Sequence, residues 1–309
     1  MKACLHAWVH PNGEDVPYGM LSWPLGGSSL NIKFWKREMV TEITLLLQRG
    51  WINLWRNKIL WAFSFLVLFD PLFRFIVPIP QSENLPSALF FLVLSFAFVY
   101  FSFMSYAGVY FVAYCAAIGR PVDFQTSFQA STNLFWKVVG ITLLLVLFVS
   151  PCLFTVFIFS FREPFQIANL AHNFFFLSIP LSIFVAMWYF PITEIIANNT
   201  KIGKSLKTAW TIFTSKFLIL AIIGLGLAFA SYAINISISI VTMLVQNSFD
   251  FAVLSKLDYI SPHLSLTGNN YYRLVSTFSQ AVWRTYSVSV FTFAYLKYSG
   301  IKMSTHSTS

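Results

Sequence analysis

Charged residues are scarce in this chain of 309 residues. Asp, Glu, Lys and Arg together make up 10% of it, whereas hydrophobic residues make up 57%. A soluble globular protein is about 25% charged and about 45–50% apolar. The composition therefore excludes an ordinary water-facing surface, and much of the apolar excess is expected to face lipid.

Catalytic and metal-binding signatures are also missing from the sequence. It contains no Walker A loop, no HExxH, no GxSxG and no EF-hand loop. Its three cysteines, Cys4, Cys115 and Cys152, have no CxxC spacing and are expected to be packing residues rather than a disulfide framework. We therefore expect no metal, no cofactor and no catalytic residue, which favours a protein that is not an enzyme.

Long apolar runs dominate the rest of the chain. Six of them occur, at residues 59–77, 85–118, 134–161, 174–197, 217–245 and 274–298. A helix needs about 20 residues to cross a hydrocarbon core about 30 Å thick. The predicted fold class is an all-α membrane protein with six transmembrane helices, accompanied by interfacial amphipathic helices.

Positive charge is concentrated in every second gap between these runs. The formal net charge is +9, and the clusters comprise Lys33, Lys36, Arg37, Arg49, Arg56, Lys58, Arg120, Lys137, Lys201, Lys204, Lys207, Lys216, Lys297 and Lys302. By the positive-inside rule, these gaps and both termini lie in the cytoplasm. The charge thus predicts a multi-pass protein of the inner (cytoplasmic) membrane. Its expected partners are the lipid bilayer and a protein that the sequence does not identify, but not nucleic acid.

The chain divides into three parts by composition. Residues 1–38 are rich in Pro and Gly and have no helical period, so we expect either a disordered tail or an extension that precedes a true start at Met39. Residues 39–302 form the predicted six-helix membrane domain, and 303–309 are a short polar tail. Within the domain, the tryptophan-bearing stripe that begins at Val40 predicts an interfacial helix, and the alternative is a long first transmembrane helix that starts early. Residues 123–136 and 201–215 are expected to form cytoplasmic amphipathic segments.

Three short motifs suggest a family. They are Arg49-Gly50-Trp51 through Asn57-Lys58-Ile59-Leu60-Trp61, then Glu194 followed by Lys204-Ser205-Leu206-Lys207-Thr208-Ala209-Trp210, and finally Ala294-Tyr295-Leu296-Lys297-Tyr298. Together they resemble a loose group of bacterial six-helix membrane proteins. This group includes the membrane domain fused to some glycerophosphodiester phosphodiesterases and an uncharacterised enterobacterial inner-membrane family. The resemblance covers about residues 39–302 and implies location and architecture. It implies no activity, because no segment of this chain could house the phosphodiesterase domain.

Four ionisable residues inside or beside the apolar runs are candidate functional residues: Asp70, Arg74, Glu194 and Arg284. A charge within the membrane costs several kcal/mol unless it is paired or hydrated. Asp70 lies about 18 Å along a helix from Lys58, and Arg284 lies about 20 Å from Lys297. These matched depths allow an ion pair. The interpretation that the sequence favours is that Asp70 caps a short outer helix and Arg74 reaches the outer headgroups.

The other polar features also allow two interpretations. Glu194 follows Pro191, where a kinked helix could let the carboxylate bind a proton or a cation, although contact with Lys201 or Lys204 is the interpretation that the sequence favours. The stripe of Thr285, Ser289 and Thr292 either lines a wet path or hydrogen-bonds a neighbouring helix. We expect hydrogen bonding.

The sequence alone favours a non-catalytic role, as an accessory protein that interacts with lipid or with a partner. The alternative is a transporter of small solutes or lipids that uses the intramembrane charges. A wet cavity at Arg284 would favour transport, and a dry bundle would favour the accessory role.

The distribution of Lys and Arg predicts the topology. Reporter fusions placed after Lys207 and after Lys302 should report a cytoplasmic location, and a fusion near His263 should report an external one, because basic loops are retained inside. An external signal after Lys207 would contradict the six-helix arrangement.

Overall fold

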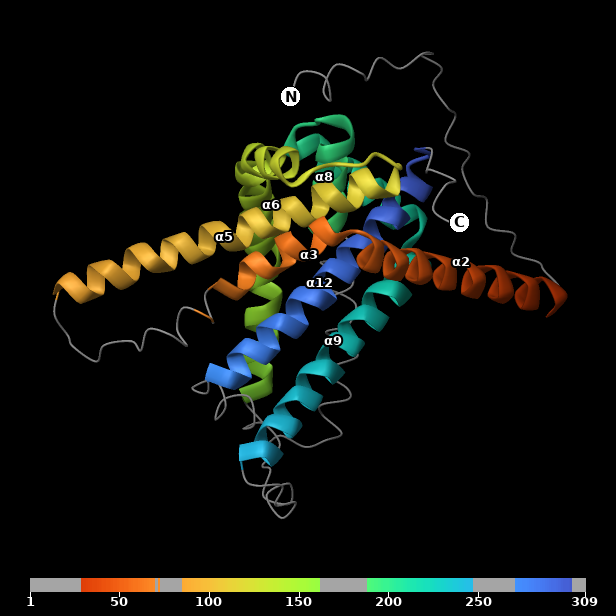
Figure 1. Ribbon diagram of the computed structural model, residues 1–309. Coiled ribbons are helices and arrows are strands. Elements are labelled where there is room, and N and C mark those ends of the chain that lie inside the picture. The colour runs from red at the N-terminus through yellow and green to blue at the C-terminus, as the bar shows by residue number, and fades with distance from the viewer. Residues whose placement is uncertain (1–28, 70–71, 73–84, 162–187, 247–269, 302–309) are drawn as a thin grey trace. The chain divides into compact units, whose positions relative to one another are not determined.

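The computed structural model describes residues 29–69, 72, 85–161, 188–246 and 270–301 (Figure 1). The regular elements in these residues are all helices, and no strand occurs among them, so the all-α fold class is confirmed. The chain separates into two compact units, Met1–Leu45 and Leu46–Ser309, which are described separately. Our expectations for residues 1–28 and 303–309 lie outside the described residues.

In the first unit, the described residues belong to helix α2 (Ser29–Arg56). The sequence showed no helical period before Val40, yet the helix begins at Ser29. The hydroxyls of Thr41 and Thr44 each donate a hydrogen bond of 2.8 Å to the carbonyl oxygen four residues earlier. These bonds satisfy the two hydroxyls within the helix itself.

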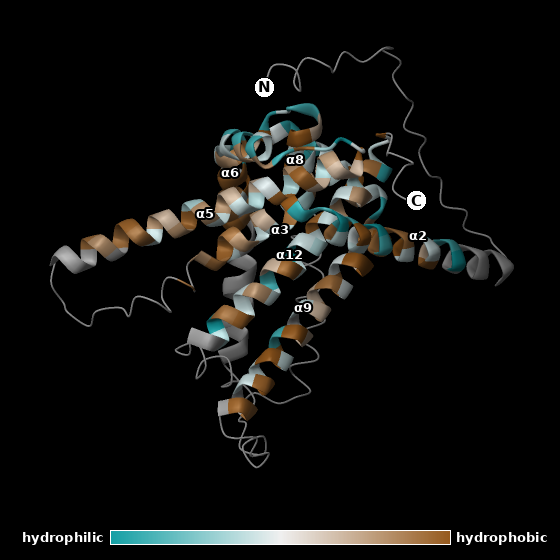
Figure 2. Cartoon of the chain, viewed as in Figure 1, coloured by the Kyte–Doolittle hydropathy of each residue, from teal (hydrophilic) through white to brown (hydrophobic). Residues whose placement is uncertain are grey.

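Three helices of the second unit are long and apolar enough to cross a membrane. They lie within α5 (Leu85–Ala117), α6 (Phe124–Phe161) and α9 (Phe217–Gln246), and their mean hydropathies over the candidate spans are 1.8, 1.7 and 2.4. Apolar residues recur along α5 and α9 in Figure 2. Three of the six predicted spans therefore form suitable helices.

The other three predicted spans are not confirmed. Of the first run, the described part forms α3 (Lys58–Phe65) and a 3-10 turn, η1 (Leu66–Leu68), with Phe69 and Leu72 also helical, and the remainder of the run lies outside the described residues. Of the fourth run, the described part is a helix over residues 188–198. The sixth run forms α12 (Asn270–Tyr298), which has 29 residues but is too polar to count as a span by its composition.

Helix α12 lies at the centre of the second unit and packs against α3, α5 and α9 (Figure 1). Every residue from Thr285 to Leu296 is buried. Its polar side chains bond to neighbouring helices: Asn53 Nδ2 donates to Ser289 Oγ at 3.2 Å, and the hydroxyls of Ser64 and Thr285 hydrogen-bond each other. For these two residues of the polar stripe, the expected bonding between helices is confirmed.

Two glycines let helices approach closely. A Cβ atom on Gly108 of α5 would lie 2.1 Å from Cδ1 of Phe63 in α3, and one on Gly50 would lie 2.4 Å from Cγ2 of Val290 in α12. Such distances are far inside van der Waals contact, so any larger residue must displace the neighbouring side chain.

The connection between α5 and α6 is fixed by local hydrogen bonds. Gly119 adopts φ 75°, and its N–H and that of Arg120 donate to the carbonyls of Ala116 and Cys115, which is a Schellman ending. Asp123 then caps α6, because its Oδ1 accepts a 2.7 Å bond from the backbone N–H of Thr126. The bonds from Thr126 hold the pKa of this exposed carboxyl below its usual range.

The two predicted cytoplasmic amphipathic segments have different outcomes. Residues 123–136 were expected to form a segment separate from the third run, but α6 continues without interruption for 38 residues. Helix α8 (Ile202–Ser215) is separate and amphipathic: Ser205, Ala209, Ile212 and Phe213 are buried, whereas Lys204, Lys207 and Trp210 are exposed. Lys216 lies at the break between α8 and α9.

Substitution of Gly108 tests the close approach of α3 and α5. We expect Gly108→Ala to lower the free energy of unfolding by about 1–3 kcal/mol through overpacking against Phe63. Gly226→Ala is the matched control, because nothing lies within 4 Å of its added Cβ, and it should raise helix stability by up to about 1 kcal/mol. Thermal unfolding in one detergent measures both, and equal shifts for the two variants would contradict the packing.

Candidate functional site

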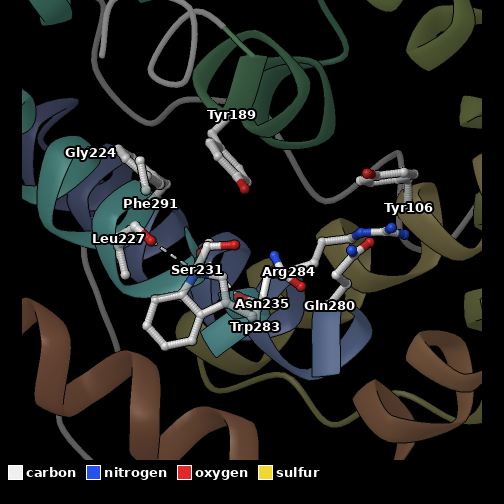
Figure 3. A pocket seen from close by; sticks show the side chains of 12 residues that line it. Tyr106, Tyr189, Gly224, Leu227, Ser231, Asn235, Gln280, Trp283, Arg284 and Phe291 are labelled. Atoms are coloured by element: carbon white, nitrogen blue, oxygen red, sulfur yellow. Dashed lines mark hydrogen bonds between the residues drawn. The ribbon is translucent and has the colours of Figure 1, made fainter. Parts of the chain in front are cut away.

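A cavity of about 280 Å³ lies in the second unit, between α5, α9, α12 and the helix over residues 188–198 (Figure 3). Helix α9 contributes Gly224, Leu227, Ala228, Ser231 and Asn235, and α12 contributes Gln280, Trp283, Arg284, Ser287 and Phe291; Tyr106 and Tyr189 complete the lining. The five residues of each helix have the same spacing: i, i+3, i+4, i+7 and i+11. That spacing is one face of an α-helix, so two helical faces form most of the wall.

The small residues of α9 leave space for the cavity, and Trp283 links α12 to α9 at its edge. Gly224, Ala228 and Ser231 occupy little volume. Trp283 Nε1 donates a 3.0 Å hydrogen bond to the carbonyl oxygen of Leu227 (Figure 3). This bond ties α12 to α9 beside the cavity.

Arg284 is the one charged side chain among the twelve residues that line the cavity. Its Cζ atom lies 3.9 Å from the centroid of the Tyr106 ring, close enough for a cation–π interaction. Its Nη1 atom is buried and has no hydrogen-bond partner. Asp70 and Arg74 lie outside the described residues, so the predicted pair of Asp70 with Arg284 stays a prediction.

A buried acceptor in the same cavity also lacks a partner. The side-chain Oδ1 of Asn235 is buried without a hydrogen bond, and this residue lines the cavity with Arg284. A buried polar group without a partner costs roughly 1–3 kcal/mol. Water or the polar atoms of a ligand would remove that cost, so the cavity is suited to polar contents.

Glu194 is positioned near the end of the helix over residues 188–198 and is only 3% exposed. Its Oε2 accepts hydrogen bonds from Asn198 Nδ2, at 3.1 Å, and from the hydroxyl of Tyr295 in α12. Lys201 and Lys204 are exposed, and neither contacts the carboxylate. The contact that the sequence favoured is therefore wrong, because a tyrosine 101 residues away supplies the partner instead.

An aromatic cluster separates Glu194 from the cavity. The rings of Tyr189 and Phe291, which both line the cavity, stack with centroids 4.6 Å apart and an interplanar angle of 8°. Phe190 packs edge-on against Phe291 and Tyr295, at 6.0 Å in each case. Phe190 precedes Glu194, and Phe291 precedes Tyr295, by four residues, so the carboxylate lies about one helical turn beyond the cavity.

The two sequence-predicted residues that are described, Arg284 and Glu194, thus belong to neighbouring sites rather than to one. Sequence reasoning missed Tyr106, Asn235 and Tyr295. Asn235 could have been found, because it is the one amide side chain in the run 217–245. Tyr106 and Tyr295 could not, because they lie in stretches where aromatic residues are common.

Removal of the guanidinium tests whether Arg284 serves stability. In the protein without added ligand, we expect Arg284→Met to change the free energy of unfolding by no more than about 1 kcal/mol. The variant loses the stack on Tyr106 but also removes a desolvated, unpartnered donor. A loss of several kcal/mol in thermal unfolding would indicate a buried acceptor for Arg284, such as Asp70.

No protein-family model, curated protein or solved structure matches this chain. The cavity at Arg284 and the buried Glu194 are therefore the features from which its function is argued.

Proposed function

We propose that this chain is an integral membrane protein that binds and transports a small oxyanion in the cavity at Arg284. The observation that carries the proposal is the buried Nη1 atom of Arg284, which has no hydrogen-bond partner among the described residues and lines a cavity that has room for one. Carboxylate and phosphate groups match the planar donor geometry of a guanidinium.

The charge of the cavity favours an anion. Among the described residues that line the cavity, Arg284 is accompanied by amides, hydroxyls and aromatic rings but by no carboxylate. A positive charge in a low-dielectric environment attracts an anion more strongly than it does in water. An anionic ligand would neutralise the guanidinium and satisfy its free donor at the same time.

The size and walls of the cavity limit the ligand. Its volume of about 280 Å³ is at the low end of ligand pockets, which measure about 300–1,000 Å³. It fits a small solute or a lipid headgroup, but not a whole lipid. The rings of Trp283, Tyr189 and Phe291 favour an anion with an apolar or aromatic part.

The membrane setting is part of the same proposal. We infer a multi-pass protein of the inner membrane with six spans and both termini in the cytoplasm, in line with the distribution of Lys and Arg. The exposed Lys204, Lys207 and Trp210 of α8, and the exposed Trp51 and Trp55 of α2, have the chemistry of an interface with lipid headgroups. The resemblance to bacterial six-helix membrane proteins is compatible with this arrangement and supplies no activity.

An accessory role in contact with a partner is the alternative outcome of the test. It was the first expectation from the sequence and required a dry bundle. The cavity, with its unpartnered donor and acceptor, favours transport over that role.

Binding is tested with benzenesulfonate, an aromatic oxyanion of constant charge, added to the full-length protein in detergent. At 100 times its dissociation constant, a ligand stabilises the folded state by about 2.7 kcal/mol, so the melting temperature of the wild type should rise by several degrees. Arg284→Met should remove the rise. Arg37→Met, which deletes the same group at an exposed position outside the cavity, should keep it.

A second experiment distinguishes an anionic lipid headgroup from a soluble anion as the ligand. The melting temperature is compared between nanodiscs of phosphatidylglycerol and nanodiscs of phosphatidylcholine. If the ligand is a headgroup, phosphatidylglycerol should stabilise the wild type and should not stabilise Arg284→Met. Uptake of radiolabelled benzenesulfonate into proteoliposomes then separates transport from binding. Equal responses of wild type and Arg284→Met in all these measurements would overturn the proposal and favour the accessory role.

A further inference from the structure

The carboxyl group of Glu194 is buried without a cation. Among the described residues its partners are two donors, the hydroxyl of Tyr295 and the amide of Asn198, and both bond to the same oxygen, Oε2. The other oxygen, Oε1, accepts no hydrogen bond from the described chain and is free to carry a proton. When only neutral donors support a buried carboxylate, the balance between its charged and neutral forms depends on its immediate surroundings.

The surroundings of Glu194 contain few other titratable groups. Tyr295 faces it from α12. Tyr114 of α5 lies near enough to interact electrostatically with both Glu194 and Tyr295, and its own buried hydroxyl has no hydrogen-bond partner. Cys115 and Arg120 interact electrostatically with Tyr114, and Lys297 of α12 is exposed. The free hydroxyl of Tyr114 is a second, independent polar group in this buried site that lacks a partner.

Glu194 is also connected to the cavity by packed rings. Tyr295, which donates to the carboxylate, packs against Phe190; Phe190 packs against Phe291, and Phe291 stacks on Tyr189 in the cavity wall. One layer of aromatic side chains therefore separates the carboxyl group of Glu194 from the space beside Arg284. Of the described residues that line that space, Arg284 alone is a cation.

We propose that Glu194 is a proton-binding site, and that its protonation is coupled to occupation of the cavity by the anion. The inference rests on the proposed function and deepens it, because it makes transport a cotransport of anion and proton. In this step Oε1 takes a proton from solvent and the carboxylate becomes a neutral carboxylic acid. No other bond forms or breaks.

The sign of the coupling follows from charge. The ionised carboxylate and an anion in the cavity repel each other, so the anion binds more tightly when Glu194 is protonated. Binding linkage is reciprocal: the bound anion must favour protonation of Glu194 to the same degree. Proton and anion consequently bind together and leave together.

The first measurement follows the proton directly. An infrared pH titration of the full-length protein in detergent should show the carbonyl stretch of a protonated, buried carboxylic acid, and this band should be missing from Glu194→Gln. Glu38→Gln, at an exposed position, is the matched control and should keep the band. If Glu194→Gln does not fold, Tyr295→Phe serves instead, since removal of one of the two donors to Oε2 should move the midpoint of the band.

The second measurement follows the anion. The affinity of the wild type for benzenesulfonate should fall by about 5-fold or more as pH rises through the titration of the band, as expected for a typical coupling. In Glu194→Gln the affinity should be independent of pH in that range and close to the low-pH value of the wild type.

The outcomes separate the inference from the proposed function. If wild type and Glu194→Gln have the same infrared titration, and Tyr295→Phe moves nothing, Glu194 takes up no proton and the inference is overturned, while binding of benzenesulfonate at Arg284 still stands. A titrating band with an affinity that ignores pH rejects the coupling. Loss of benzenesulfonate binding in every variant and the wild type rejects the proposed function and the coupling together, and the infrared band then reports on the proton site alone.

Discussion

Complete burial of α12 from Thr285 to Leu296 is the constraint on which the second unit depends. Polar side chains of a helix surrounded by other helices find their partners inside the protein, although the buried Oγ1 of Thr292 has no hydrogen-bond partner among the described residues. Asn53 and Ser64 are such partners for Ser289 and Thr285, and Gly50 lets α2 approach closely enough to take part. The ends of α2 and α3 that face α12 are therefore specified by its polar residues as much as by apolar contact.

The same helix carries the chemistry on its other faces. Arg284 directs its guanidinium to the Tyr106 ring, Trp283 bonds to α9, and Tyr295 bonds to Glu194. Structural and functional polar groups thus alternate along a few turns of α12, and its low hydropathy is explained by both. A helix this polar is stable at the centre of the bundle and would be costly at its edge, where the same groups would face lipid.

Features of the fold could be predicted from the sequence where a physical requirement produces a pattern of neighbouring residues. Runs two, three and five are continuous and apolar, as helices that can cross a membrane must be, and Arg284 was identified because a charge in an apolar run needs a reason. The reasoning failed where partners are distant or a boundary leaves no mark. Lys201 is close to Glu194 in sequence, but folding brings Tyr295 instead. No Gly or Pro occurs from Phe124 to Val139, so nothing breaks α6 where the amphipathic segment meets the apolar run.

The bond from Trp283 to the carbonyl of Leu227 has a consequence for how this protein can change over evolutionary time. A main-chain acceptor is present whatever side chain occupies its position, so residue 227 can drift without loss of the bond, whereas residue 283 must keep an indole or another long donor. We therefore expect substitutions to accumulate unevenly along the seam between α9 and α12. Diverged descendants of this chain would keep the tryptophan while its neighbour on the facing helix is exchanged freely among apolar residues.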